Sequence, residues 1–125
     1  MKEKLINEWI YKAEEDFESA MYLVKKRKNV APDSVCFHSQ QCIEKYLKAF
    51  LIKNDVVPPE VHDLQRLRVL CANIDKDFNL ISEELDILNA YAVNFRYPGE
   101  QATIEESKEA ALKMREIREF IRKKI

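Results

Sequence analysis

Glycine is almost absent from this chain, and its scarcity limits the number of sharp turns that the backbone can make. The 125 residues contain one glycine, Gly99, and four prolines. With 46% apolar and 34% charged residues, this composition favours a few long helices over many short strands. We therefore expect an all-α fold. The length is that of a single domain, over residues 1–125.

Apolar residues that recur at intervals of three and four indicate where the helices lie. The expected elements are a first helix over residues 3–28, a second over 33–53, a short helix from near His62–Asp63 to Ile74, a helix from Ser82 to Arg96–Tyr97 and a last helix after Thr103. We expect residues 75–82 to be irregular. Four substantial helices, one short helix and short loops imply an up-and-down four-helix bundle with an additional short helix.

The same intervals predict which residues face the core. They place Leu5 in the inward stripe of the first helix, Ile74 in that of the short helix and Ile104 in that of the last helix. The second helix has one broad apolar face, formed by Cys36, Ile43, Tyr46, Leu47 and Phe50. Caps are expected from Asp33 or Ser34 on the second helix, from Ser82 on the fourth, and from a Thr103–Glu106 capping box on the last.

Polar residues line the border of this apolar face in an ordered way. Gln40, Glu44 and Lys48 are four residues apart and form one stripe, and Gln41 and Lys45 form a second stripe beside it. A helix that is only buried on one side and solvated on the other does not need such an ordered border. The border is therefore a candidate part of a functional site.

The charges nearly balance, which excludes nucleic-acid binding through a uniformly basic surface. Lys and Arg total 21 against 22 acidic residues, so any contact with a nucleotide or nucleic acid is local. Residues 25–28 are four consecutive bases, which suit either a phosphate patch or the last turn of the first helix. We favour the helix end, because acidic residues within 14–18 offset the field. The bases of the last helix, including Arg118, alternate with acids and indicate a solvated face.

Several kinds of site are not expected from this sequence. Two histidines and three cysteines without a C-x-x-C or H-E-x-x-H spacing predict neither a metal site nor a cofactor. One glycine excludes a glycine-rich phosphate loop. The odd number of cysteines, and the lack of a signal peptide or a membrane-spanning stretch, predict reduced thiols and a cytoplasmic protein.

A second concentration of polar residues occurs at the end of the fourth helix, over residues 94–98. Arg96 beside Tyr97 has what is needed to bind a phosphate while an aromatic ring stacks on a base, with Asn94 nearby. Equally, Arg96 could pair with Glu44 or a helix carbonyl and lock the bundle. At His62–Asp63, capping of free amide groups is favoured over contact with a ligand.

Three segments together resemble the HEPN domain family. They are F-H-S-Q-Q-C-I-E-K-Y-L-K-A-F-L at 37–51, H-D-L at 62–64 and F-R-Y-P at 95–98, and they follow an N-terminal helix with a Trp and A-E-E-D-F. The resemblance implies a compact helical bundle that dimerises. It also implies a nucleotide-binding or RNA-cleaving module, often encoded beside a small nucleotidyltransferase as a toxin and antitoxin pair.

The chain departs from that family at one position that matters for catalysis. Members that cut RNA have an Arg and a His separated by four to six residues, which would bind the phosphate and transfer protons. Here Arg96 is followed at those spacings by Gln101, Ala102 and Thr103. Because glutamine does not transfer protons near neutral pH, binding is favoured over cleavage.

The resulting expectation is a homodimeric module that binds a nucleotide or RNA phosphate, with a minimal nucleotidyltransferase as partner. Its predicted ligand contacts are Asn94, Arg96, Tyr97, Gln41, Lys45 and Lys48, and its structural residues are Glu44, His62, Asp63 and Pro98. One alternative is a metal-free endoribonuclease toxin that uses Arg96, with a base from His38, His62 or the dimer partner. The other is a purely structural dimerisation domain in which Gln40, Glu44, Lys48 and Arg96 form a buried network.

Overall fold

The computed structural model describes residues 1–94 and 98–125, and every regular element in those two ranges is a helix. The elements are α1 (Lys2–Val24), α2 (Pro32–Lys53), α3 (Leu64–Ile74), the 3₁₀ helix η1 (Lys76–Ile81), α4 (Ser82–Asn94) and α5 (Ile104–Arg122). The predicted all-α bundle with an additional short helix is therefore confirmed.

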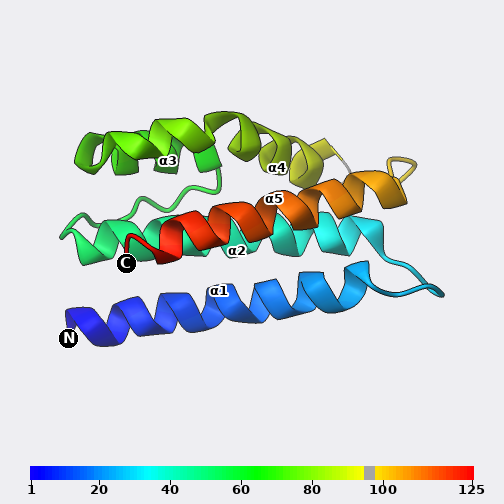
Figure 1. Ribbon diagram of the computed structural model, residues 1–125, viewed down its shortest axis with the longest axis horizontal. Helices are drawn as coiled ribbons and strands as arrows, with labels where there is room; N and C mark the ends of the chain where they lie inside the picture. The colour runs from blue at the N-terminus through cyan, green and yellow to red at the C-terminus, as the bar shows by residue number, and fades with distance from the viewer. Residues whose placement is uncertain (95–97) are drawn as a thin grey trace.

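Helix α2 occupies the centre of the bundle and contacts each of the other α-helices (Figure 1). Figure 1 shows α1 antiparallel to α2 along one side, with α3 and α4 along the other side and α5 across the front. The α1–α2 turn and the connection into α5 lie at one end of the bundle, and the two chain termini lie toward the other. At the first of these ends a hydrogen bond connects the two segments: Ala102 N donates to Asp33 Oδ1 at 2.7 Å.

The apolar face predicted for α2 forms the core. Its five residues, Cys36, Ile43, Tyr46, Leu47 and Phe50, are between 0% and 3% exposed. A helix surrounded by neighbours on several sides must bury more than one stripe, which explains why α2 also buries polar side chains. Gln40, Glu44 and Lys48, predicted at the border of this face, are 5%, 3% and 7% exposed.

Helix α1 ends earlier than predicted, at Val24, with Lys25 as its C-cap. Residues 25–28, the run of four bases, lie outside the helix. Asn29 then adopts a positive φ of 53°, a conformation that Asn tolerates better than most residues. The last turn of α1 consequently contains no basic residue.

Two predicted caps are wrong, and one is confirmed. Ala31 is the N-cap of α2, without a side-chain bond, because the Asp33 carboxylate accepts from Ala102 instead. Ser82 does not cap α4, since η1 leads directly into it. The segment predicted to be irregular is thus a 3₁₀ helix that buries Phe78 and Ile81. The Thr103 capping box on α5 forms as predicted.

Three residues predicted to face the core are instead substantially exposed. They are Leu5, Ile74 and Ile104, at 44%, 40% and 45% exposure. Each lies within the first or last turns of its helix, where neighbouring elements no longer cover the inward stripe. On α1, Ile6 is buried in place of Leu5.

A carboxylate of α1 ties three helices together. Arg118 of α5 donates from Nε and Nη2 to the two oxygens of Glu14, at 2.7 and 2.6 Å. The fully buried Tyr46 of α2 donates its hydroxyl hydrogen to Glu14 and accepts from Arg122 Nη1 at 2.9 Å. The Arg118 hydrogen bonds hold the pKa of Glu14 below its usual value. Arg118 is therefore part of the packing between α1 and α5, and the predicted solvated face is wrong at this position.

We expect Glu14→Gln to lower stability at neutral pH and to flatten its dependence on acid pH. The Glu14 carboxylate has a lowered pKa in the folded protein, so it stabilises the fold fully at any pH above the pKa of the unfolded state, about 4.3. This contribution is lost as the pH falls toward the pKa of the folded state. Urea unfolding between pH 7 and pH 3 should show a loss of roughly 1–3 kcal/mol at pH 7. The exposed Glu18→Gln is the control, and equal acid slopes in wild type and Glu14→Gln would contradict the role of this carboxylate.

Candidate functional site

The polar residues of α2 separate into two clusters, each with one carboxylate, one lysine and one histidine. We call the first the α1–α2 cluster, formed by Asp16, His38 and Lys45. The second is the α2–loop cluster, formed by Glu44, Lys48 and His62 with Gln40 and Gln41 beside them. The two clusters differ in how far their histidines are open to solvent.

The α1–α2 cluster lies at the contact between the two helices. Lys45 Nζ donates to Asp16 Oδ2 at 2.5 Å, and His38 Nδ1 lies 2.8 Å from Asp16 Oδ1. The Asp16 side chain is only 11% exposed, so an unpaired charge there would be costly. Lys45 thus compensates a carboxylate that packs against α2.

The α2–loop cluster is built around a buried carboxylate. Lys48 Nζ donates to Glu44 Oε2 at 3.0 Å, and His62 Nδ1 lies 3.1 and 3.2 Å from the two Glu44 oxygens. The Glu44 side chain is 4% exposed, whereas that of His62 is 82% exposed. Gln40 Nε2 donates to the His62 carbonyl at 2.8 Å, which fixes the loop against α2. Gln41 Nε2 donates to Gln40 Oε1 at 3.0 Å and completes the cluster.

This geometry gives His62 a defined orientation. Because Nδ1 faces the carboxylate, Nε2 is the ring nitrogen that remains for another molecule. A histidine oriented by a carboxylate is a common means of presenting one ring nitrogen for proton transfer or hydrogen bonding. His38 also contacts a carboxylate, but its side chain is 29% exposed.

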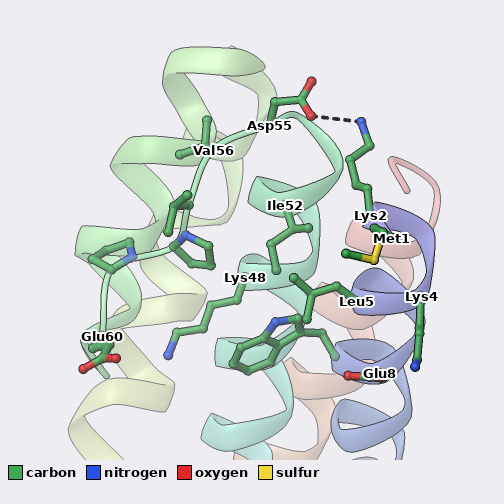
Figure 2. A pocket seen from close by; sticks show the side chains of 14 residues that line it. Met1, Lys2, Lys4, Leu5, Glu8, Lys48, Ile52, Asp55, Val56 and Glu60 are labelled. Atoms are coloured by element: carbon green, nitrogen blue, oxygen red, sulfur yellow. Dashed lines mark hydrogen bonds and ion pairs between the residues drawn. The ribbon is translucent and has the colours of Figure 1, made fainter.

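A groove of about 890 Å³ adjoins the α2–loop cluster, between the first half of α1 and residues 55–60 (Figure 2). Its lining is largely apolar and includes Trp9 and Ile52. Lys48 connects the groove to the cluster, since its Nζ lies 5.4 Å from the centroid of the Trp9 ring and also contacts Glu44. Figure 2 shows the Lys48 side chain extending across the groove toward the segment that contains Glu60.

The structure describes only some of the residues predicted as ligand contacts. Lys45 and Lys48 are both paired with carboxylates, and Gln41 is half-buried beside Glu44. Arg96 and Tyr97 lie outside the described residues, and Asn94 is described only as the last residue of α4. Their approach to α2 stays a prediction.

The residues predicted to be structural include two with a described role in the loop before α3. Asp63 is the N-cap of α3, and its Oδ1 accepts from Gln65 N at 2.9 Å. His62 does not cap this helix, because its ring contacts Glu44. Pro98 lies in an exposed turn with Gly99, whose φ of +90° favours glycine.

One participant, Asp16, is missing from the sequence prediction. It lies three residues after Ala13 and four before Ala20, both fully buried, so it occupies the inward stripe of α1. A carboxylate on an apolar stripe requires a cation from a neighbouring helix, and that was the available signal.

The described residues offer few other reactive groups. Among them, no group of three or more His, Cys, Asp and Glu side chains could hold a metal ion. Burial raises the pKa of the Cys36 and Cys71 thiols to about 12, so both are protonated at neutral pH. Within residues 1–94 and 98–125, no helix is long and apolar enough to span a membrane.

We expect Glu44→Ala to destabilise the protein strongly, because it leaves the Lys48 ammonium buried without a carboxylate. The expected loss is roughly 3–5 kcal/mol in urea unfolding. Replacing both partners, with Glu44→Leu and Lys48→Met, should recover most of that loss, since an apolar pair of similar size has no charge to compensate. Glu60→Ala, at an exposed carboxylate beside the groove, should change stability by less than about 0.5 kcal/mol. A loss below about 1 kcal/mol for Glu44→Ala would contradict this account.

Comparison with known proteins places the chain in a family. The profile of the HEPN domain matches residues 6–124. A protein of Methanocaldococcus jannaschii named "Putative toxin MJ1304" is 53% identical over 49 residues, which are 39% of this chain and 30% of that protein. The match thus spans less than a third of that relative, and no solved structure gives a significant match. Because the profile covers nearly the whole chain, this protein belongs to the HEPN domain family.

Proposed function

We propose that this protein is the HEPN member of a toxin–antitoxin-like pair and binds the phosphate of a nucleotide or an RNA beside α2. The observation that carries the proposal is the exposed His62 ring, held by the buried Glu44 next to Lys48. The name of the relative in Methanocaldococcus jannaschii supports a role in a toxin system. A minimal nucleotidyltransferase is the proposed partner.

The charges of the α2–loop cluster define what each residue contributes to such a site. Lys48 and Glu44 compensate each other, so these two side chains alone attract a phosphate weakly. The positive charge for the ligand therefore comes from Arg96, with Tyr97 stacking on the base. His62 and Gln41 add hydrogen-bond donors at the cluster. Lys45 is assigned a supporting role, because Asp16 engages its ammonium.

Calorimetric titration with ATP and other nucleotides tests the ligand. We expect Arg96→Ala to weaken binding by roughly 10- to 100-fold, as for the loss of a charge-assisted hydrogen bond worth about 1.5–3 kcal/mol. The exposed Arg115→Ala on α5 removes the same charge elsewhere and should bind like wild type. Equal heats for wild type and Arg96→Ala, or no heat with any nucleotide, would eliminate nucleotide binding at this residue.

A second candidate function, metal-free RNA cleavage, is favoured by the orientation of His62. In such a reaction the ribose 2′-oxygen attacks the phosphorus, the bond to the 5′-oxygen breaks, and a histidine accepts or donates the transferred proton. The family's histidine after Arg96 is missing, but His62 Nε2 is available and its ring is oriented by Glu44. In this mechanism Arg96 binds the phosphate and Glu44 is a positioning residue.

Cleavage of labelled RNA by the purified protein tests this second function. We expect His62→Asn to reduce the rate by about 10²–10⁴-fold, the usual contribution of a general acid or base, and Arg96→Ala to abolish cleavage. His38→Asn separates the two candidate bases: because His38 is less exposed and belongs to the cluster on the α1 side, this variant should cleave like wild type if His62 is the base. If wild type cleaves no RNA, or if both His62→Asn and Arg96→Ala cleave normally, the ribonuclease assignment fails.

A further inference from the structure

Four consecutive bases, Lys25 to Lys28, follow α1 at the end of the bundle that is remote from the groove (Figure 1). In the helix-end interpretation these bases lie in the last turn of α1, where positive charge stabilises free carbonyl groups. The structure ends α1 at Val24 and leaves no basic residue in that turn. Lys25 is the C-cap, so the helix end accounts for this residue, whereas Lys26, Arg27 and Lys28 lie beyond it.

The turn borders a hollow of about 410 Å³ between the ends of α1, α2 and α5. Four cations line it: Lys25, Lys26 and Arg27 from the turn, and Lys108 from α5. No acidic residue is among the described residues that line it. Its remaining wall is mostly apolar and includes Val30, Val35 and Ile104.

No carboxylate among the residues that the structure describes engages these cations. In the described ranges, none of the four lining cations has an ion-pair partner or a side-chain hydrogen bond. The contrast with Lys45 and Lys48 is clear, since both of those ammonium groups contact a carboxylate. Positive charge at the hollow is consequently available to an external anion.

The acidic residues of α1 offset this charge less than their number suggests. Glu14 is bound by Arg118, and Asp16 is bound by Lys45 and His38, so both carboxylates are compensated within the bundle. Glu18 remains close to the turn, because it lines a neighbouring hollow together with Lys25 and Lys26. Of these three carboxylates, that of Glu18 is the one that lies beside bases of the turn.

We propose that the Lys25–Lys28 turn and Lys108 form a second RNA-binding site, which holds the phosphodiester backbone of a single strand. Lysine and arginine around a concave surface suit phosphate oxygens, and the apolar wall suits the face of a base. The volume of the hollow is in the range of small-ligand sites, which fits one nucleotide of a strand better than the surface of an acidic protein.

This site is separate from the one under the proposed function and does not depend on it. Glu44 is twelve residues along α2 from Pro32, which borders the hollow, and a helix rises about 1.5 Å per residue. The two sites are therefore about 18 Å apart along the helix axis.

Fluorescence anisotropy with a labelled oligouridylate, measured over a series of salt concentrations, tests the proposal. Each phosphate contact with a single strand contributes about 0.7 to the slope of log affinity against log salt. Lys25→Gln with Lys26→Gln should weaken binding at low salt and lower the slope by about 1.4. Lys76→Gln with Lys123→Gln removes the same charge from exposed positions elsewhere and should leave the slope unchanged.

Two further arms separate the sources of a change. The first arm repeats the measurement in an Arg96→Ala background. Lys25→Gln/Lys26→Gln should still bind RNA with a lower salt slope than Lys76→Gln/Lys123→Gln, whether or not Arg96→Ala weakens nucleotide binding. Uridine monophosphate should compete far more weakly than the oligouridylate, because it supplies one phosphate. Unchanged affinity and slope in the Lys25→Gln/Lys26→Gln variant would overturn the proposal. The same holds if this variant binds RNA like wild type but no longer binds an acidic protein partner.

Discussion

The bundle depends on the pairing of carboxylates of α1 and α2 with cations at the helix contacts. Glu14, Asp16 and Glu44 each lie at a contact of α2, and each is matched by a base: Arg118, Lys45 and Lys48. Removing a carboxylate from water is costly, and a nearby cation offsets that cost only when the hydrogen-bond geometry is good. The Glu14–Arg118 and Asp16–Lys45 pairs therefore constrain how α1 meets α5 and α2, beyond what apolar packing requires, whereas the Glu44–Lys48 pair lies within α2. They also determine which bases remain available for ligands.

Sequence periodicity was sufficient for the core of α2, and a capping motif was sufficient for the start of α5, where periodicity wrongly placed Ile104 in the core. The buried face from Cys36 to Phe50 follows from the spacing of apolar residues, and the Thr103 capping box is a local motif. The sequence left the polar border open between a ligand site and a buried network, because a long lysine can extend to solvent or toward a neighbouring helix. The pairing of Arg118 with Glu14 joins residues 104 positions apart, and no local pattern contains that information.

Membership of the HEPN family and the absence of a histidine after Arg96 can be reconciled by the position of His62. The proposed chemistry needs an ionisable ring near the phosphate, and the position of that ring in the sequence is secondary to its position in space. The loop before α3 offers such a ring on the surface of α2, beside the groove. In our two proposals, phosphate binding and RNA cleavage then differ only in whether the His62 ring transfers a proton.

The loop at His62 is attached to α2 through two different groups of the same residue. Its carbonyl is bound by Gln40, and its ring contacts Glu44 one turn further along the helix. The path of the backbone is therefore fixed independently of the side chain that the loop displays. A substitution at His62 would change the group that the loop presents and leave the hydrogen bond between Gln40 and the loop carbonyl in place.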